Sequence, residues 1–303
     1  MLIDIHCHSS CTEGLCRPNG KRYPKPQELV EMMDALSIDK AVLLSTVSPE
    51  FRYSFVTPEE VHKIWAEYPQ RFIPFCSLDP RMLTNSPDAD FRPMLEYYKE
   101  HGFKGVGEYI PNLPFDDPLN LNVFKQVEEI GLPLTFHIAP AIGGHYGCYD
   151  ELGLPRLERV LAACPKLVFL AHSQSFWSEI SADVTEKTRH DYPKGKVEPG
   201  RAVELFRRYE NLHGDLSAGS GYNAISRDPD FGYGFLEEFQ DRLYFATDIA
   251  NVPQKTPIVP YFEKLRQEKL IPEAAYNKIT SQNAVKLFDL DLGYSSTSVF
   301  PAI

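Results

Sequence analysis

The chain has 303 residues, of which 43% are hydrophobic, 24% charged and 12% aromatic. This ordinary composition excludes a disordered chain, a collagen-like repeat and a disulfide-dense mini-protein. Lys and Arg total 31 against 42 Asp and Glu, a formal charge of −11, so we expect neither nucleic acid nor anionic lipid as a partner. With six cysteines, no transmembrane run and no basic leader before the first strand-like residues, we expect a cytoplasmic protein without a disulfide framework.

Short apolar runs recur along the chain and predict eight strands. Their starts lie roughly 30 to 40 residues apart, about the length of a strand, a helix and two loops. Most are nearly continuous apolar runs, which is typical of parallel strands buried on both faces. The expected strands are Leu2–Cys7, Lys40–Ser45, Phe72–Leu78, Phe103–Tyr109, Leu132–Ile138, Leu167–His172, Asn211–Ser217 and Leu243–Asp248.

Helical patterns separate these strands. Thr57 followed by Pro58 is typical of a helix start, with a capping hydroxyl and proline at the first position. Strands that alternate with helices favour a (β/α)₈ TIM barrel as a single domain over residues 1–303; a doubly wound open sheet is the alternative. Other expected helices are Gln27–Leu36, Asn120–Ile130, Leu154–Cys164, Pro257–Glu268 and Pro272–Ser281.

The first strand carries the sequence Asp4-Ile5-His6-Cys7-His8. Side chains alternate along a strand, so Asp4, His6 and His8 are expected to share one face. Two imidazoles one pleat apart suit a Zn²⁺-type ion, although a pair of structural histidines is an equal alternative. Asp4 either orients a histidine or binds backbone amides, and we favour the structural role.

Further metal-binding residue types end other expected strands. His137 ends the fifth, His172 the sixth and Asp248 the eighth. Each alone is a common turn or capping residue. Together with the histidine pair, they predict a metal site at the carboxyl ends of the strands, where barrel enzymes hold their active sites.

These stretches resemble the amidohydrolase superfamily, particularly the amidohydrolase-related group of decarboxylases, lactone hydrolases and hydratases. The resemblance covers essentially the whole chain and implies a TIM barrel with a divalent metal. It does not fix the reaction, because this fold carries many chemistries. The residues that carry it are Asp4–His8, Gly102–Pro111, Gly131–His137, Leu167–Ser173, Asp241–Asp248 and Ser281–Phe288.

The resemblance also implies roles for the site residues. His6, His8, His137 and Asp248 would bind the metal, and Asp248 would also act as general base. His172 would either bind metal or, as our first choice, hydrogen-bond a substrate oxygen.

Glu108 departs from the group's pattern, in which the matching position is usually apolar. TatD-type nucleases have Gly-Glu here, and their glutamate bridges two metals; Asp116 and Asp117 are similar to that pattern too. The alternative is a glutamate paired with a Lys or Arg at the barrel mouth. If Glu108 and His172 both bind metal, the site is binuclear.

The expected activity is hydrolysis of an amide, ester or lactone of a small, carboxylated substrate by a metal-activated water. Zn²⁺ is the preferred ion and Mn²⁺ the alternative, with one or two ions per chain. A decarboxylase or hydratase is the second hypothesis, and a binuclear TatD-like phosphodiesterase or nuclease is a weaker third. A non-catalytic barrel is the weakest. A homo-oligomer is compatible with the fold, but the sequence shows no defined interface.

Loops after the strands are expected to recognise the substrate. Gly143–Gly147 is interpreted as a mobile lid, and Ser173–Trp177 either lines the pocket or packs on a helix. Asp215 on the seventh strand either reaches the pocket or fills a barrel layer. The first loop holds cations that suit a carboxylate, although each one alone is more typical of a solvated surface: Arg17, Lys21, Arg22 and Lys25.

Overall fold

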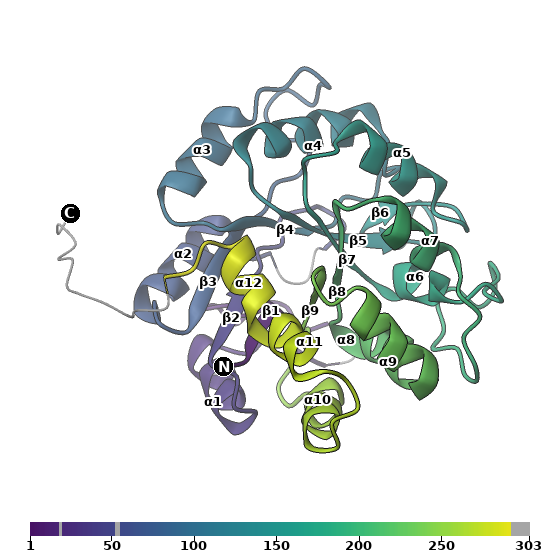
Figure 1. Ribbon diagram of the computed structural model, residues 1–303. Coiled ribbons are helices and arrows are strands. Elements are labelled where there is room, and N and C mark those ends of the chain that lie inside the picture. Colours follow the sequence, from purple (N-terminus) through teal and green to yellow (C-terminus); the bar gives the residue numbers. More distant parts are fainter. Residues whose placement is uncertain (18–19, 52–54, 292–303) are drawn as a thin grey trace.

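A computed structural model describes residues 1–17, 20–51 and 55–291 (Figure 1). Its main feature is a parallel sheet in the order β1-β2-β3-β4-β5-β7-β8-β9, with the short β6 paired to β5. Each successive pair is joined by a crossover, so all carboxyl ends of the strands lie at one end of the sheet. The strands are β1 (Ile3–Cys7), β2 (Lys40–Leu43), β3 (Phe72–Cys76), β4 (Gly105–Tyr109), β5 (Leu134–Ala139), β6 (Cys148–Tyr149), β7 (Phe169–His172), β8 (Leu212–Asp215) and β9 (Leu243–Tyr244).

The sheet closes on itself where the last strand meets the first. The backbone N–H of Ile5 donates to the Phe245 carbonyl at 3.1 Å, and the N–H of His8 donates to the Ile249 carbonyl at 2.9 Å. Asp248 N–H donates in return to the His6 carbonyl at 2.9 Å. This closure confirms the predicted TIM barrel and excludes the open sheet.

Helices surround the barrel on the outside (Figure 1). Several begin as predicted: the Thr57 hydroxyl accepts the Glu60 N–H, and Pro58 occupies the first turn of α2. None of the described helices is long and apolar enough to span a bilayer. The α-helices are α1 (Pro26–Ala35), α2 (Pro58–Glu67), α3 (Arg92–Glu100), α4 (Pro118–Ile130), α5 (Pro155–Ala163), α6 (Gln174–Trp177), α7 (Arg201–Arg208), α8 (Ala218–Ser226), α9 (Pro229–Glu238), α10 (Ile258–Gln267), α11 (Glu273–Asn277) and α12 (Asn283–Leu287).

The apolar residues form two separate clusters. The larger one lies between the strands and the surrounding helices. The smaller one fills the amino-terminal end of the barrel, and Ala284 of α12 and Phe288 directly after that helix belong to it. Figure 1 shows α12 lying across the barrel. The inside of the barrel is thus mainly apolar at this end, and its buried carboxylates and most of its buried histidines lie toward the carboxyl end. The barrel residues of the inner cluster are Ile3, Ile5, Val42, Leu44, Ile73, Phe75, Leu170, Tyr244 and Ala246.

The predicted elements differ from the observed ones mainly at their ends. The strand expected over Leu243–Asp248 ends at Tyr244, and Asp248 follows it in a left-handed conformation with φ of 54°. β6 was not predicted, because two residues are too short to give an alternating pattern. The helix expected over Pro272–Ser281 continues from α11 through a π-helical turn, Lys278–Gln282, into α12.

Candidate metal centre

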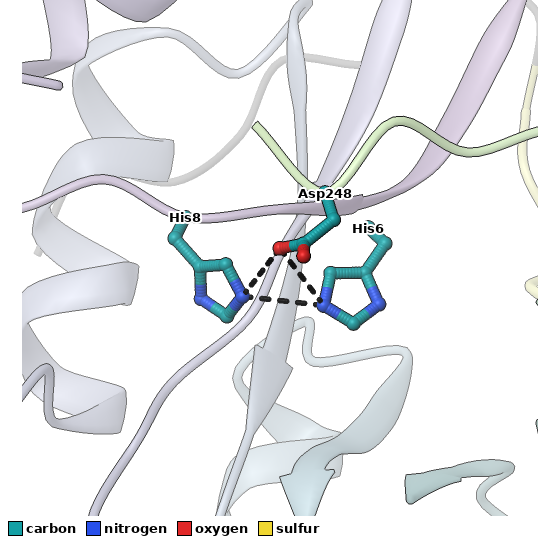
Figure 2. Close-up of side chains that lie close together, drawn as sticks. All are labelled: His6, His8 and Asp248. Carbon is teal, nitrogen blue, oxygen red and sulfur yellow. Dashed lines mark hydrogen bonds and ion pairs between the residues drawn. The ribbon is translucent and has the colours of Figure 1, made fainter. Parts of the chain in front are cut away.

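His6 of β1 and His8, directly after that strand, face each other at the carboxyl end of the barrel. Their Nε2 atoms lie 3.2 Å apart, and both rings are buried. Oδ1 of Asp248, brought beside them by barrel closure, lies 3.7 Å from His6 Nε2 and 3.5 Å from His8 Nε2 (Figure 2). Three potential ligand atoms from the two ends of the chain therefore face a common point.

The alternation expected along β1 does not hold at Asp4. The register between β1 and β2 shifts between Asp4 and Cys7. The Asp4 carboxylate accepts hydrogen bonds from the backbone of His6 and Thr247, both at 3.0 Å, and from the Thr247 hydroxyl. Asp4 thus has the structural role of joining the first strand to the segment after β9. Burial raises its pKa to about 6, against these hydrogen bonds, which lower it.

A second group of potential ligands consists of Glu108, His137 and His172. Glu108 Oε1 lies 2.9 Å from His137 Nδ1 and 3.8 Å from His172 Nε2. Its Oε2 lies 3.5 Å from Nε2 of His8 and 3.9 Å from Nε2 of His6. Each oxygen of this buried carboxylate therefore faces one histidine group. The described residues show no Lys or Arg ion pair to Glu108, so the pairing considered for it at the barrel mouth is not formed.

The backbone of β4 directs Glu108 inward. Val106 and Tyr109 both pack in the outer cluster, and the register between β4 and β5 shifts between them. Gly107 allows this path because glycine has no Cβ atom. In any other residue, the Cβ atom would lie only 2.9 Å from Thr135 Cβ. The close approach of β4 and β5 brings Glu108 within hydrogen-bond distance of His137.

Two residues at and just after the end of β8 contact the Nδ1 atoms of His6 and His172. Asp215 Oδ2 lies 2.6 Å from His6 Nδ1, and the Ser217 hydroxyl lies 2.7 Å from His172 Nδ1. The other Asp215 oxygen accepts the Ser217 N–H at 3.0 Å. With Nδ1 engaged, the Nε2 atom of each ring faces the barrel centre. A carboxylate behind a ligating histidine is a recurring feature of metal sites.

The sequence left the role of Asp215 open, and the structure resolves it. His213, two residues earlier on the same face, lies 2.8 Å from the Tyr244 hydroxyl and fills a layer below the site. Asp215 is one layer higher and reaches His6. Ser217 was not predicted as a site residue, because a serine after a strand is an ordinary turn residue.

Burial and neighbouring charges shift the protonation of the cluster. Burial lowers the pKa of both His8 and His172 to about 3, so these rings are neutral. Burial opposes a charge on His6 as well, but the adjacent Asp215 carboxylate outweighs it and raises the pKa of His6 to about 10. Burial and the Glu108 charge raise the pKa of Asp248 to about 7, although nearby His6 lowers it.

The donor set fits divalent cations. Imidazole nitrogens and carboxylate oxygens are the ligands that Zn²⁺ and Mn²⁺ accept in proteins. The Nε2 atoms of His6 and His8 face each other at 3.2 Å, and with His8 neutral one of them offers a lone pair. Within the described ranges the groups His6–His8–Asp248 and Glu108–His137–His172 each satisfy the proximity expected of a metal site.

A cavity of about 850 Å³ opens above this cluster. His8, Glu108, His172 and Asp248 form part of its lining, so the candidate ligands are accessible to a small molecule. Of the expected lid, Tyr146 lines the cavity and its ring lies 4.6 Å from the His137 ring. Further lining residues from the loops are Arg17, Lys21, Tyr23, Phe51, Asn251 and Lys255.

Several other candidates lie outside the cluster. Arg22 pairs with Glu28 at 2.7 Å, and Lys25 precedes the first turn of α1. Phe176 and Trp177 are buried in the outer cluster, as in the helix-packing alternative. The two acids considered with Glu108 also have structural roles: Asp116 pairs with Arg156 and Arg159, and Asp117 caps α4.

A closed parallel barrel with histidines and carboxylates gathered at the carboxyl ends of its strands defines the class of metal-dependent TIM-barrel enzymes. Within that class, residues 3–290 match the family model described as Amidohydrolase, and the chain belongs to this family of metal-dependent enzymes. No curated protein matches the chain in sequence.

Solved structures with the same fold include enzymes of different reactions. The 2,6-dihydroxybenzoate decarboxylase from Rhizobium is 18% identical, with 94% of this chain and 99% of that chain covered and a TM-score of 0.56. A probable 2-pyrone-4,6-dicarboxylic acid hydrolase from Acinetobacter baumannii is 15% identical, with 95% and 99% covered and a TM-score of 0.58. A dihydroxybenzoic acid decarboxylase from Polaromonas sp. JS666, solved with bound manganese, is 18% identical, with 86% and 85% covered and a TM-score of 0.52.

Proposed function

We propose that the protein is a hydrolase with two divalent cations, acting on an amide, ester or lactone of a small, carboxylated substrate. The observation that carries this proposal is the position of Glu108. One of its oxygens faces the group of His6 and His8, and the other faces His137 and His172. A carboxylate with one oxygen toward each of two ligand groups is suited to bridging two cations, as in two-metal hydrolytic sites.

The ligands divide between the two cations accordingly. His6, His8 and Asp248 would hold one cation, and His137 and His172 the other. Glu108 would be shared. Zn²⁺ is our first assignment and Mn²⁺ the second, because both accept this mixture of nitrogen and oxygen ligands. Bound cations of this kind supply a water that ionises near neutral pH and polarise the carbonyl of the substrate.

Asp248 is the proposed general base. Its carboxylate lines the cavity and is 27% exposed, whereas that of Glu108 is 5% exposed. From this position the Asp248 carboxylate would accept a proton from the attacking water and return it to the leaving group. His172 is assigned to holding a cation, because its Nδ1 is engaged by Ser217 and its Nε2 faces Glu108. In a site with a single ion, His172 keeps the alternative role of hydrogen-bonding the substrate oxygen.

The test compares wild type with Glu108→Gln. Metal content is measured by plasma mass spectrometry on protein purified without a metal-affinity tag, and hydrolysis is measured on a panel of esters, lactones and amides of small acids. We expect two ions per chain and hydrolysis in wild type, and at most one ion with little hydrolysis in the variant. The matched control is Glu129→Gln, an exposed glutamate 3.9 Å from Arg92. One ion per chain in wild type, or an unchanged content in Glu108→Gln, would contradict the proposal.

Decarboxylation or hydration is the second candidate. It is supported by the fold shared with the two decarboxylases, one of which contains manganese. The group of His6, His8 and Asp248 offers three ligands to a single ion. Release of CO₂ from a carboxylated substrate would favour decarboxylation over hydrolysis, and addition of ¹⁸O from labelled water without cleavage of a bond would favour hydration. Cleavage of a phosphodiester would favour the third hypothesis.

A further inference from the structure

Arg17 is a cation on the wall of the cavity that has no carboxylate partner among the described residues. Its Nη1 donates to the Asn251 side-chain oxygen at 3.1 Å and its Nη2 to the Ala250 carbonyl at 3.0 Å. The buried Nε–H has no hydrogen-bond partner in the described part of the chain. Arg22, in the same loop, is by contrast neutralised by both oxygens of Glu28 at 2.7 Å. Arg17 thus retains an uncompensated charge and a free donor beside the cavity.

Tyr23 lies between Arg17 and the candidate metal ligands. The Arg17 guanidinium carbon is 4.7 Å from the centre of the Tyr23 ring, and the same ring stacks on His8 at 5.1 Å with an interplanar angle of 6°. These contacts keep the guanidinium within the length of a small molecule from His8. They also hold it by a cation–π interaction in a fixed orientation.

The Tyr23 hydroxyl is a second polar group without a partner. Tyr23 is a lining residue of the cavity and only 4% exposed, and within the described ranges its buried hydroxyl forms no hydrogen bond. A buried hydroxyl that lacks a partner costs free energy, which a ligand in the cavity can recover. Burial raises the pKa of this hydroxyl, and the other groups that act on its pKa are four lining residues of the cavity: Arg17, Glu108, Tyr146 and Asp248.

We propose that Arg17 and Tyr23 form a subsite for a carboxylate of the substrate that is remote from the reacting bond. Arg17 offers its charge and its free Nε–H, and Tyr23 offers its hydroxyl and supports the guanidinium. Guanidinium groups match the planar geometry of carboxylates. This subsite adds a substrate feature to the proposed function. It rests on that function only for the position of the reacting bond, which lies at the candidate metal ligands.

The same wall favours a flat substrate. The rings of Tyr23 and Phe51 lie 6.2 Å apart at 18°, and Phe51 contacts Tyr146 edge-on at 4.9 Å. All three line the cavity. Aromatic walls beside a fixed cation select planar acids, because flat apolar rings bury well against them. The substrate class is therefore a planar, conjugated or aromatic acid.

The test uses benzoate and benzamide, which share a shape and differ in charge. Calorimetry on the metal-loaded protein compares wild type, Arg17→Gln, Tyr23→Phe and Arg22→Gln, and is repeated after chelation so that metals cannot bind the carboxylate. We expect wild type to prefer benzoate by roughly 10- to 100-fold, the range for a hydrogen bond to a charged group. Arg17→Gln should abolish the preference, Tyr23→Phe should reduce it, and Arg22→Gln should leave it unchanged. Thermal melting checks that each variant folds, and Arg17→Lys should restore part of the preference.

The outcomes separate this proposal from the proposed function. An unchanged preference in Arg17→Gln, or equal binding of both probes by wild type, would overturn the subsite even if the protein hydrolyses esters. A lost preference in Arg17→Gln would support the subsite even if only one ion binds and no hydrolysis occurs, because the chelated protein reports binding without metal chemistry.

Discussion

The Asp215 carboxylate lies 2.6 Å from Nδ1 of His6, on the opposite side of the ring from the Nε2 atom that faces His8. This contact engages Nδ1 of His6 and leaves Nε2 as the ring nitrogen that faces the barrel centre. Asp215 therefore acts on the candidate metal centre through His6, without facing the shared point itself.

Replacing this carboxylate should weaken the metal site while preserving its shape. For Asp215→Asn we expect metal affinity to fall about 10- to 100-fold, because the neutral amide no longer supports the basicity of His6. Competition with a chromophoric chelator measures the affinity, and Asp34→Asn on α1, 63% exposed, is the control. An affinity equal to that of wild type would show that Asp215 only fills space.

Metal binding to the chelated protein should tighten as the pH rises. Without metal, His6 with its pKa of about 10 and Asp248 with its pKa of about 7 both bind protons at the atoms that a cation must occupy. Protons therefore compete most below pH 7, and the competition at His6 persists until about pH 10. Titration calorimetry in buffers of different ionisation enthalpy should detect proton release at neutral pH. Affinity that is independent of pH between 6 and 9 would contradict this.

Asp248→Asn should affect the chemical step more than the fold. An amide cannot accept a proton, so kcat on any ester or lactone turned over by wild type should fall roughly 10²- to 10⁴-fold. The metal content measured on the same sample shows how much of the loss reflects the missing ligand. A variant that keeps half or more of the wild-type kcat would exclude Asp248 as the general base.

Gly107→Ala should destabilise the barrel next to the site. The added Cβ would lie 2.9 Å from Thr135 Cβ, so β4 and β5 must separate. Overpacking of this kind costs about 1–3 kcal/mol, which thermal or denaturant unfolding detects. Because β4 and β5 carry Glu108 and His137, metal affinity should fall in the same variant. Gly234→Ala on α9, whose added Cβ meets no atom within 4 Å beyond the neighbouring backbone of its own helix, should unfold at or above the wild-type midpoint, because alanine favours a helix over glycine.

The barrel and the candidate ligands at the strand ends could both be predicted from the sequence, because both depend on local patterns. Apolar runs define the strands, and His137, His172 and Asp248 follow those runs directly. Side-chain alternation alone could not predict to which side of the sheet a residue beside a register shift points. Asp4 turns away from His6 and His8 at such a shift, and Glu108 turns inward at another.

The supporting residues depended on contacts across long sequence separations. Asp215 meets His6 from 209 residues away, and nothing in the local pattern around Asp215 distinguishes this partner from others. Arg17 and Arg22 are equivalent as a pair of loop cations in the sequence. The structure distinguishes them. Arg22 is paired with Glu28, whereas Arg17 lines the cavity and is the cation proposed to bind a ligand.

Closure of the barrel between His6 and Asp248 has a consequence for biosynthesis. A growing chain that has emerged from the ribosome only as far as β8 already contains His6, His8, Glu108, His137, His172 and Asp215, but it lacks Asp248 and the strand that seals the barrel. The group of His6, His8 and Asp248 is therefore complete only after the last strand has been made, whereas Glu108, His137 and His172 are all present earlier. The cation proposed for His6, His8 and Asp248 would thus bind only at the end of synthesis, to a nearly finished protein.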